Sequence, residues 1–266
     1  MSISRIAMPS REASVSWPDY VLAGSIGTLA LLAWLSLWLW GRSPGGHLLM
    51  HGARHVNLSG SGLFYYGALF VLGWTLMTIA MMLPTAVPLL LLFRRMAGSR
   101  SNSAGLMALL VAGYLAVWIL FGIVAQLAGR LLGGMAGRWS WVQASPWAVP
   151  AALLAVAGLY QFSSLKYACL EKCRTPMSFL IARWQGGREA WQAARIGIDH
   201  GIYCVGCCWS LMLLMFLMGA GSLGWMLILG IVMALEKNLP WGRKLSAPVG
   251  GVLLLAAAMV AYRAGF

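Results

Sequence analysis

The stretch Leu106–Ala128, LMALLVAGYLAVWILFGIVAQLA, holds no charged residue and decides the class of fold. Its length is close to the roughly 20 residues that an α-helix needs to cross about 30 Å of hydrocarbon. Tyr20–Trp40 and Ile202–Met218 have the same character. These runs are apolar on every side, whereas the strands of a membrane barrel alternate apolar and polar residues. The sequence therefore predicts an all-α protein whose helices form a bundle across a lipid bilayer.

The composition agrees with this prediction. Hydrophobic residues make up 61% of the chain and charged residues only 9%, against roughly 25% charged residues in a soluble domain. The formal net charge of +13 comes from basic residues that gather in short segments between the apolar stretches. No recognition helix and no basic surface interleaved with aromatic residues accompanies them, which excludes nucleic acid as the expected partner. The lipid bilayer is the expected partner instead.

The apolar stretches predict about seven membrane spans. The range is six to seven, because the boundary of the sixth span is weakly defined. The predicted spans cover residues 20–40, 64–92, 105–128, 147–165, 198–219, 222–238 and 247–263. Pro84 and Pro88 interrupt the second span and predict a kink near Met82, because proline cannot continue the hydrogen bonding of a helix. The sixth span is short, and Glu236 next to Lys237 indicates a helix end at the membrane interface.

The positive charges predict the orientation. With the N-terminus inside, 14 of the 19 Lys and Arg residues fall on the inner side, as the positive-inside rule requires. We therefore expect a multi-pass protein of a bacterial inner (plasma) membrane. Residues 1–19 would form a cytoplasmic tail and residues 20–266 a single transmembrane domain. Between spans four and five, residues 166–197 mix tryptophans with arginines and predict an amphipathic helical segment on the inner surface, broken at Gly186–Gly187.

Cysteines give the sharpest chemical signal in the chain. They form two groups, Cys169-x3-Cys173 and Cys204-x2-Cys207-Cys208, and His200 precedes the second group by four residues. Residues three and four apart share one face of a helix. Both groups lie near the inner ends of predicted spans, so neighbouring spans would bring them together. Thiolates and imidazole select Cu(I) foremost, with Zn(II) as the second choice. There are two competing interpretations: the cysteines are simply small buried residues, or they form a redox pair.

Two further groups are candidate ligands. Met81 and Met82 stand just before Pro84, where a helix break can free backbone groups at a functional site, and thioethers bind Cu(I) without losing a proton. On the outer side, the spacing His47-x3-His51-x3-His55 would place three imidazoles on one helix face. The histidines are candidates for an outer site that captures a metal ion before it moves inward.

Several motifs of the chain resemble those of a bacterial family of predicted metal-binding integral membrane proteins. They are MMLPTAVP at 81–88, GYLAVW at 113–118, AGLYQ at 157–161, LK at 165–166 with Cys169, Cys173 and Arg174, GIYCVGCCW at 201–209, and LEK at 235–237. The resemblance spans about residues 64–240. It implies a metal site that contains Met81, Met82 and the five cysteines. His200 and the three outer histidines rest on their spacing alone.

The leading hypothesis is a membrane protein that binds Cu(I), or less readily zinc, for transport, for delivery or for metalloprotein assembly. It requires no catalysis, and no phosphate-binding loop couples it to ATP. A metallochaperone or a membrane complex would be its protein partner. One alternative is a membrane thiol-disulfide oxidoreductase that uses the Cys-x2-Cys pair. Another is a structural or assembly subunit of a larger membrane complex, for which 14 Trp and 32 Gly offer packing surfaces.

Overall fold

A computed structural model describes residues 17–43, 61–98, 100, 102–136, 138, 140–184, 187–215 and 222–265. These residues form helices and contain no strand, which confirms the all-α class. The helices are α1 (Trp17–Arg42), α3 (Ser61–Met81), η1 (Pro84–Ala86), α4 (Val87–Ala97), α5 (Ser103–Ala136), α6 (Ser140–Ala144), α7 (Ala148–Tyr160), α8 (Ser164–Arg174), α9 (Pro176–Arg183), α10 (Glu189–Leu213), α12 (Leu223–Asn238), η2 (Gly242–Leu245) and α13 (Ser246–Gly265).

Five of the described helices are long and apolar enough to cross a membrane, which is fewer than the seven predicted spans. They are α1, α3, α5, α10 and the segment from η2 through α13, and the count rises to six if the bent pair α7–α8 forms one span. The predicted fourth span, 147–165, is bent by 62° between α7 and α8. Ser163 starts α8 there as its N-cap, since its side chain accepts from the backbone N–H of Lys166. The predicted sixth span, α12, has only 16 residues.

The predicted kink near Met82 is confirmed. Helix α3 ends at Met81, a short 3-10 turn starts at Pro84, and α4 continues from Val87. A proline has no N–H to donate, and its ring clashes with the carbonyl group four residues earlier, so Pro84 stops α3. Thr85 caps the break by donating from its hydroxyl to the Met82 carbonyl at 2.7 Å. The break places Met82 in the interior, where it is fully buried.

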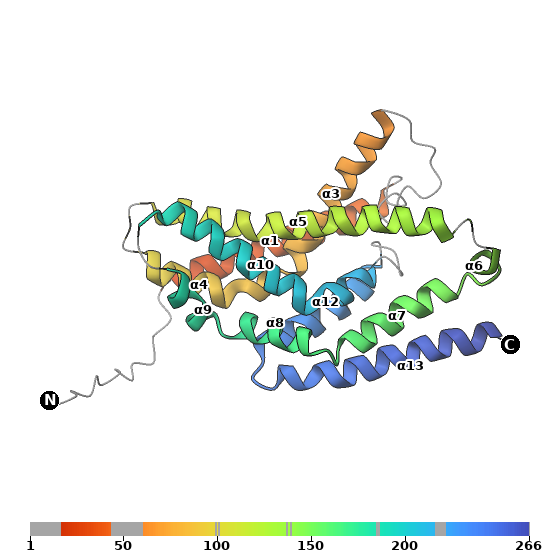
Figure 1. Cartoon of the computed structure of the whole chain (residues 1–266). Helices are drawn as coiled ribbons and strands as arrows, with labels where there is room; N and C mark the ends of the chain where they lie inside the picture. The colour runs from red at the N-terminus through yellow and green to blue at the C-terminus, as the bar shows by residue number, and fades with distance from the viewer. Residues whose placement is uncertain are drawn as a thin grey trace.

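Helices α5 and α10 pack side by side (Figure 1). Glycines on α10 permit the close approach. A Cβ added at Gly201 would lie 2.9 Å from Cβ of Val117 and 3.2 Å from the Tyr114 carbonyl oxygen, and a Cβ at Gly197 would collide with the Leu110 backbone. Small residues at helix contacts let two backbones pack closely in this way in membranes. The contact sets α10, and with it the second cysteine group, against α5.

The segment predicted to be amphipathic is helical, and it packs one face against the bundle while the other face is exposed. Helix α8 packs against α10, and its Lys166 and Leu170 are buried. Phe179 and Leu180 on α9 are also buried. Residues 189–197 are not a separate surface helix, because they form the first turns of α10. The predicted break falls between α9 and α10, where Gly187 has a φ of 75°, a conformation that glycine adopts without steric cost.

Ion pairs tie together one end of the bundle. Arg95 on α4 lies 2.9 Å from Asp19 on α1, Arg100 pairs with Glu189, and Arg183 lies 2.6 Å from Asp199. These pairs join the start of α1, the end of α4 and the start of α10 at the left of Figure 1. The structure thus brings together at one end parts of three of the four segments that the charge distribution assigned to the inner side.

Candidate metal centre

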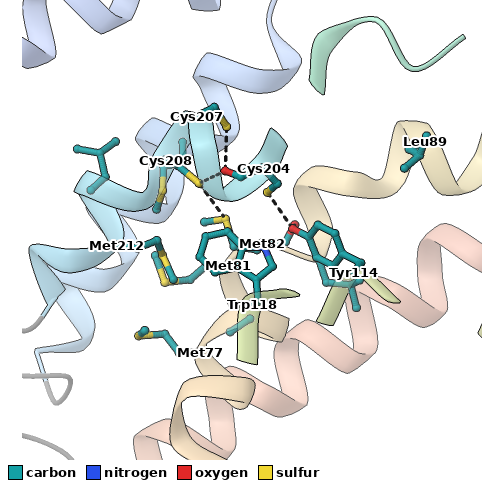
Figure 2. Packing of buried hydrophobic residues seen from close by; sticks show 14 of the residues in the cluster. Met77, Met81, Met82, Leu89, Tyr114, Trp118, Cys204, Cys207, Cys208 and Met212 are labelled. Atoms are coloured by element: carbon teal, nitrogen blue, oxygen red, sulfur yellow. Dashed lines mark hydrogen bonds between the residues drawn. The ribbon is translucent and has the colours of Figure 1, made fainter. Parts of the chain in front are cut away.

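Sulfur atoms from two distant segments meet in the core. The thiol of Cys208 on α10 lies 3.8 Å from Sδ of Met82 at the α3–η1 break. Cys204 and Cys207 lie on the same face of α10, and all four side chains are almost completely buried. Figure 2 shows Met82 facing this row of cysteines. The three- and four-residue spacings of the cysteines put them on one helix face, as predicted from the sequence.

The thiols of the α10 cysteines turn back on their own helix. Cys207 Sγ lies 3.1 Å and Cys208 Sγ 2.9 Å from the carbonyl oxygen of Cys204, and both thiols donate to it. Their side chains also interact with that of Cys204. All are free thiols. In this state the sulfurs are held close together without a bond between them, so each can become a thiolate ligand.

Cys204 has two polar neighbours that connect it to the rest of the core. Nζ of Lys237 lies 3.0 Å from its Sγ, and the hydroxyl of Tyr114 lies 3.1 Å away. Lys237 comes from the end of α12 and also lies 3.5 Å from Sδ of Met82 and 3.4 Å from the hydroxyl of Thr85. An ammonium group in this position stabilises a negative charge on the cysteine sulfur, because the surroundings exclude water.

The first cysteine group approaches the second from α8. The side chain of Cys173 interacts with that of Cys207. Cys169 packs against Gly206, where an added Cβ would lie 2.5 Å from its Sγ. Both α8 cysteines are only partly buried. The structure therefore brings Cys173 to the row of cysteines on α10 and leaves Cys169 at the margin of that row. Of the two cysteines on α8, Cys173 is the one that meets the second group.

The other predicted ligands differ in their placement. Met81 is buried on the α12 side, with its Cε next to Gly230. His200 is buried between aromatic rings, 5.8 Å from the Tyr114 ring and 6.0 Å from the Phe179 ring between centroids. His47, His51 and His55 lie outside the described residues.

The arrangement has no ready-made cage of the usual metal-binding residues. Across the residues that the structure describes, no group of three or more His, Cys, Asp or Glu side chains could hold a metal ion. The sulfurs that do meet belong to cysteines and a methionine. Thiolates combined with a thioether suit a soft ion of low coordination number, which is the preference of Cu(I).

Buried methionines extend from this centre along the interior. They are Met77 on α3, Met212 and Met215 at the end of α10, and Met226 and Met233 on α12. Figure 2 shows Met77, Met81 and Met212 beside Met82. Thioethers fill irregular gaps in hydrophobic cores, and they are also weak Cu(I) ligands.

Sequence reasoning missed the buried charges. Glu236 and Lys237 were expected to mark an interface, but both are buried, and they point to different partners. Glu236 pairs with Lys166, whose Nζ lies 2.8 Å from Oε2, while Ser246 donates to Oε1 at 2.9 Å. Lys166 also donates to Gln161. A helix end was predicted correctly, but only the packing of α8 and α13 around it buries the charges. In the sequence, the LEK motif at 235–237 was the one feature that could have pointed to these buried charges.

The fold and the centre together define an all-helical protein with apolar helices of membrane-spanning length and a buried cluster of cysteine and methionine sulfurs. The chain belongs to the PpoB2 copper chaperone family, whose model matches residues 71–260. The match includes the α3–α4 break and both cysteine groups, and it agrees with the metal-related family that the motifs resemble. Neither the curated proteins nor the solved structures contain a match.

Proposed function

We propose that this protein is a membrane-embedded chaperone that holds Cu(I) between Cys204, Cys208 and Met82 and passes it to a partner. The observation that carries the proposal is the approach of Cys208 Sγ to Met82 Sδ at 3.8 Å in the buried core. Family membership supplies the link to copper. Cu(I) is here the cargo of the protein, and its ligands would be two thiolates and one thioether.

Cu(I) fits this donor set better than zinc does. Zinc sites are almost always tetrahedral with nitrogen, sulfur or carboxylate donors, whereas a methionine thioether is a soft donor that favours Cu(I). Among the described residues, Asp199 and Glu236 are engaged away from the centre, since Asp199 pairs with Arg183 and Glu236 with Lys166. Zinc therefore remains the second choice of cargo.

A second pair of sulfurs adjoins the first. Cys173 and Cys207 interact with each other, and Cys207 also interacts with Cys204 and Cys208. Cys169 and Cys173 are only partly buried. The pair of Cys173 and Cys207 is therefore more accessible than the pair of Cys208 and Met82. Copper would enter or leave through α8 and reach the Met82 site by exchange between neighbouring sulfurs. The buried methionines would extend this route toward the opposite end, where His47, His51 and His55 would capture or release the ion.

The long apolar helices support a location in the bilayer. The finer predictions remain part of this proposal: a bacterial inner membrane, an N-terminus in the cytoplasm, a single domain over residues 20–266 and up to seven crossings. The basic residues favour the end that holds the ion pairs as the cytoplasmic one. Cys169 and Cys173 lie toward that end and would face a cytoplasmic metallochaperone or a membrane complex. Holding and passing an ion requires no catalysis.

The contact between Cys173 and Cys207 also favours a second candidate, a thiol-disulfide oxidoreductase. Two interacting thiols on different helices can close and open a disulfide. An oxidoreductase would show a thiol count that falls by two on mild oxidation and returns on reduction, with no requirement for metal. The chaperone proposal instead requires reduced thiols for copper binding.

The full-length protein, purified in detergent and kept reduced, tests the proposal. Metal content measured by mass spectrometry after anaerobic addition of Cu(I) should be close to stoichiometric in the wild type. The variant Cys204→Ser/Cys208→Ser should lose this copper, because a serine hydroxyl does not replace a thiolate as a Cu(I) ligand.

Cys169→Ser is the matched control, since it removes a thiol at the margin of the cluster. It should retain the copper of the Met82 site. Stoichiometric Cu(I) in the double variant, or an empty wild-type protein under the same conditions, would refute the chaperone proposal and leave the redox pair as the function to pursue.

A further inference from the structure

Lys237 carries a positive charge into the centre of the sulfur cluster. Its side chain is 7% exposed, and its Nζ contacts Cys204 Sγ at 3.0 Å and Met82 Sδ at 3.5 Å. These are two of the three sulfurs assigned to copper in the proposed function. The ammonium also interacts electrostatically with Cys207, Cys208 and Tyr114. A lysine next to these sulfur atoms changes the electrostatic energy of every charged group that the site holds.

No carboxylate neutralises this lysine within the described part of the chain. The adjacent Glu236 is directed to Lys166 and Ser246. The remaining polar neighbours of Lys237 Nζ, Met82 and Thr85, are uncharged. Burying an unpaired ammonium is costly, so the neighbouring sulfur of Cys204, which accepts from it, is the group that offsets this cost. When the cysteines become thiolates on binding a metal ion, Lys237 is their counter-charge.

We infer that Lys237 is the residue that makes the centre selective for a monovalent soft cation. The inference rests on the proposed function, because it assumes that Cys204 and Cys208 hold the metal. Two thiolates and Cu(I) or Ag(I) carry one net negative charge, which the ammonium cancels. Two thiolates and Zn(II) carry none, so the ammonium leaves one uncompensated positive charge. In a buried site that imbalance is costly, whereas the neutral combination is not.

The position of Lys237 allows this role without displacement of the metal. The lysine approaches from α12, whereas Cys204 and Cys208 project from α10 and Met82 from the α3–η1 break. A thiolate sulfur has more than one lone pair, so Cys204 can accept from the ammonium while it binds an ion. Lys237 is then a specificity-determining residue that contacts the ligands and not the metal.

The test compares three metals with full-length protein in detergent. Cu(I), Ag(I) and Zn(II) affinities are measured by competition with chelators for wild type, Lys237→Leu and Lys237→Arg. Lys237→Leu removes the charge without adding a metal ligand, and it should bind Cu(I) and Ag(I) at least about tenfold more weakly and bind Zn(II) as well as or better than the wild type does. Lys237→Arg keeps the charge and should keep the preference for monovalent ions.

Lys244→Leu is the matched control, because it removes an equal charge from an exposed lysine in η2, and it should change none of the affinities. An unchanged or tighter Cu(I) affinity in Lys237→Leu, or an equal loss for all three metals, overturns the inference. Lys237→Gln replaces the leucine variant if that variant does not fold. The Cys204→Ser/Cys208→Ser variant separates the two proposals: if it still binds Cu(I), the proposed function fails, and if it does not, only the role of Lys237 is in question.

Discussion

Lys166 and Glu236 form an ion pair in the interior of the protein, with Nζ 2.8 Å from Oε2 and both side chains at most 2% exposed. The pair joins α8 to α12, and Ser246 attaches α13 to the same carboxylate. Arg174 adds a second link by donating to the Glu236 carbonyl oxygen at 2.6 Å. Because Cys169 and Cys173 lie on α8, this pair determines where the first cysteine group sits.

The first prediction concerns this ion pair. Glu236→Gln should lower the free energy of unfolding by about 3–5 kcal/mol, because it leaves the Lys166 ammonium buried without its charge partner. Thermal unfolding in detergent, followed by circular dichroism, measures the change. The double variant Lys166→Met/Glu236→Gln should recover part of the loss, since it removes the uncompensated charge. A Glu236→Gln variant as stable as the wild type would show that the pair does not hold α8 in place.

The second prediction concerns the contact between α5 and α10. Gly201→Ala should destabilise the protein by roughly 1–3 kcal/mol, the usual cost of overpacking, because its Cβ would meet Val117 and the Tyr114 carbonyl. It should also weaken Cu(I) binding by shifting Cys204 relative to Tyr114. Gly224→Ala is the control, since a Cβ at Gly224 meets nothing within 4 Å and alanine is the better helix former. Equal effects of the two substitutions would contradict the close packing.

The third prediction isolates the thioether. Met82→Leu conserves volume, so the fold should be retained with a cost below about 1.5 kcal/mol, while Cu(I) affinity should fall by about tenfold through loss of one soft ligand. Competition with a chromophoric Cu(I) chelator gives the affinity. Met259→Leu, on an exposed site of α13, controls for the loss of a methionine as such. Unchanged affinity in Met82→Leu would remove Met82 from the site.

The fourth prediction separates binding from transfer along the interior. Met212→Leu, near the C-terminal end of α10, should leave the Cu(I) affinity of the Met82 site within about twofold and slow the release of Cu(I) to an acceptor chelator on the far side of a vesicle. Stopped-flow absorbance on protein in sealed vesicles measures the rate. Release at the wild-type rate would indicate that the buried methionines serve packing alone.

The sequence predicted that the α10 cysteines share one helix face for a definite reason. The spacing of Cys204, Cys207 and Cys208 fixes their common face once the segment is helical, and a helix is the obligatory form of an apolar stretch in lipid. The two prolines near Met82 similarly fix the break. The span count was less reliable, because hydropathy does not report a bend such as the one after Tyr160. The predicted role of the five cysteines, Met81, Met82 and His200 as metal ligands stays a prediction.

By itself, the sequence determined the all-helical class, the apolar helices and the clustering of cysteines, since each follows from the composition and period of one segment. Only the tertiary structure decided that Met82 faces Cys208, that Lys237 lies against Cys204 and that Glu236 pairs with Lys166. These contacts join residues that are 126, 33 and 70 positions apart. The physical reason is that the burial of a charge depends on which other helices pack around it, and helix packing depends on small residues such as Gly197 and Gly201 whose partners lie elsewhere in the chain.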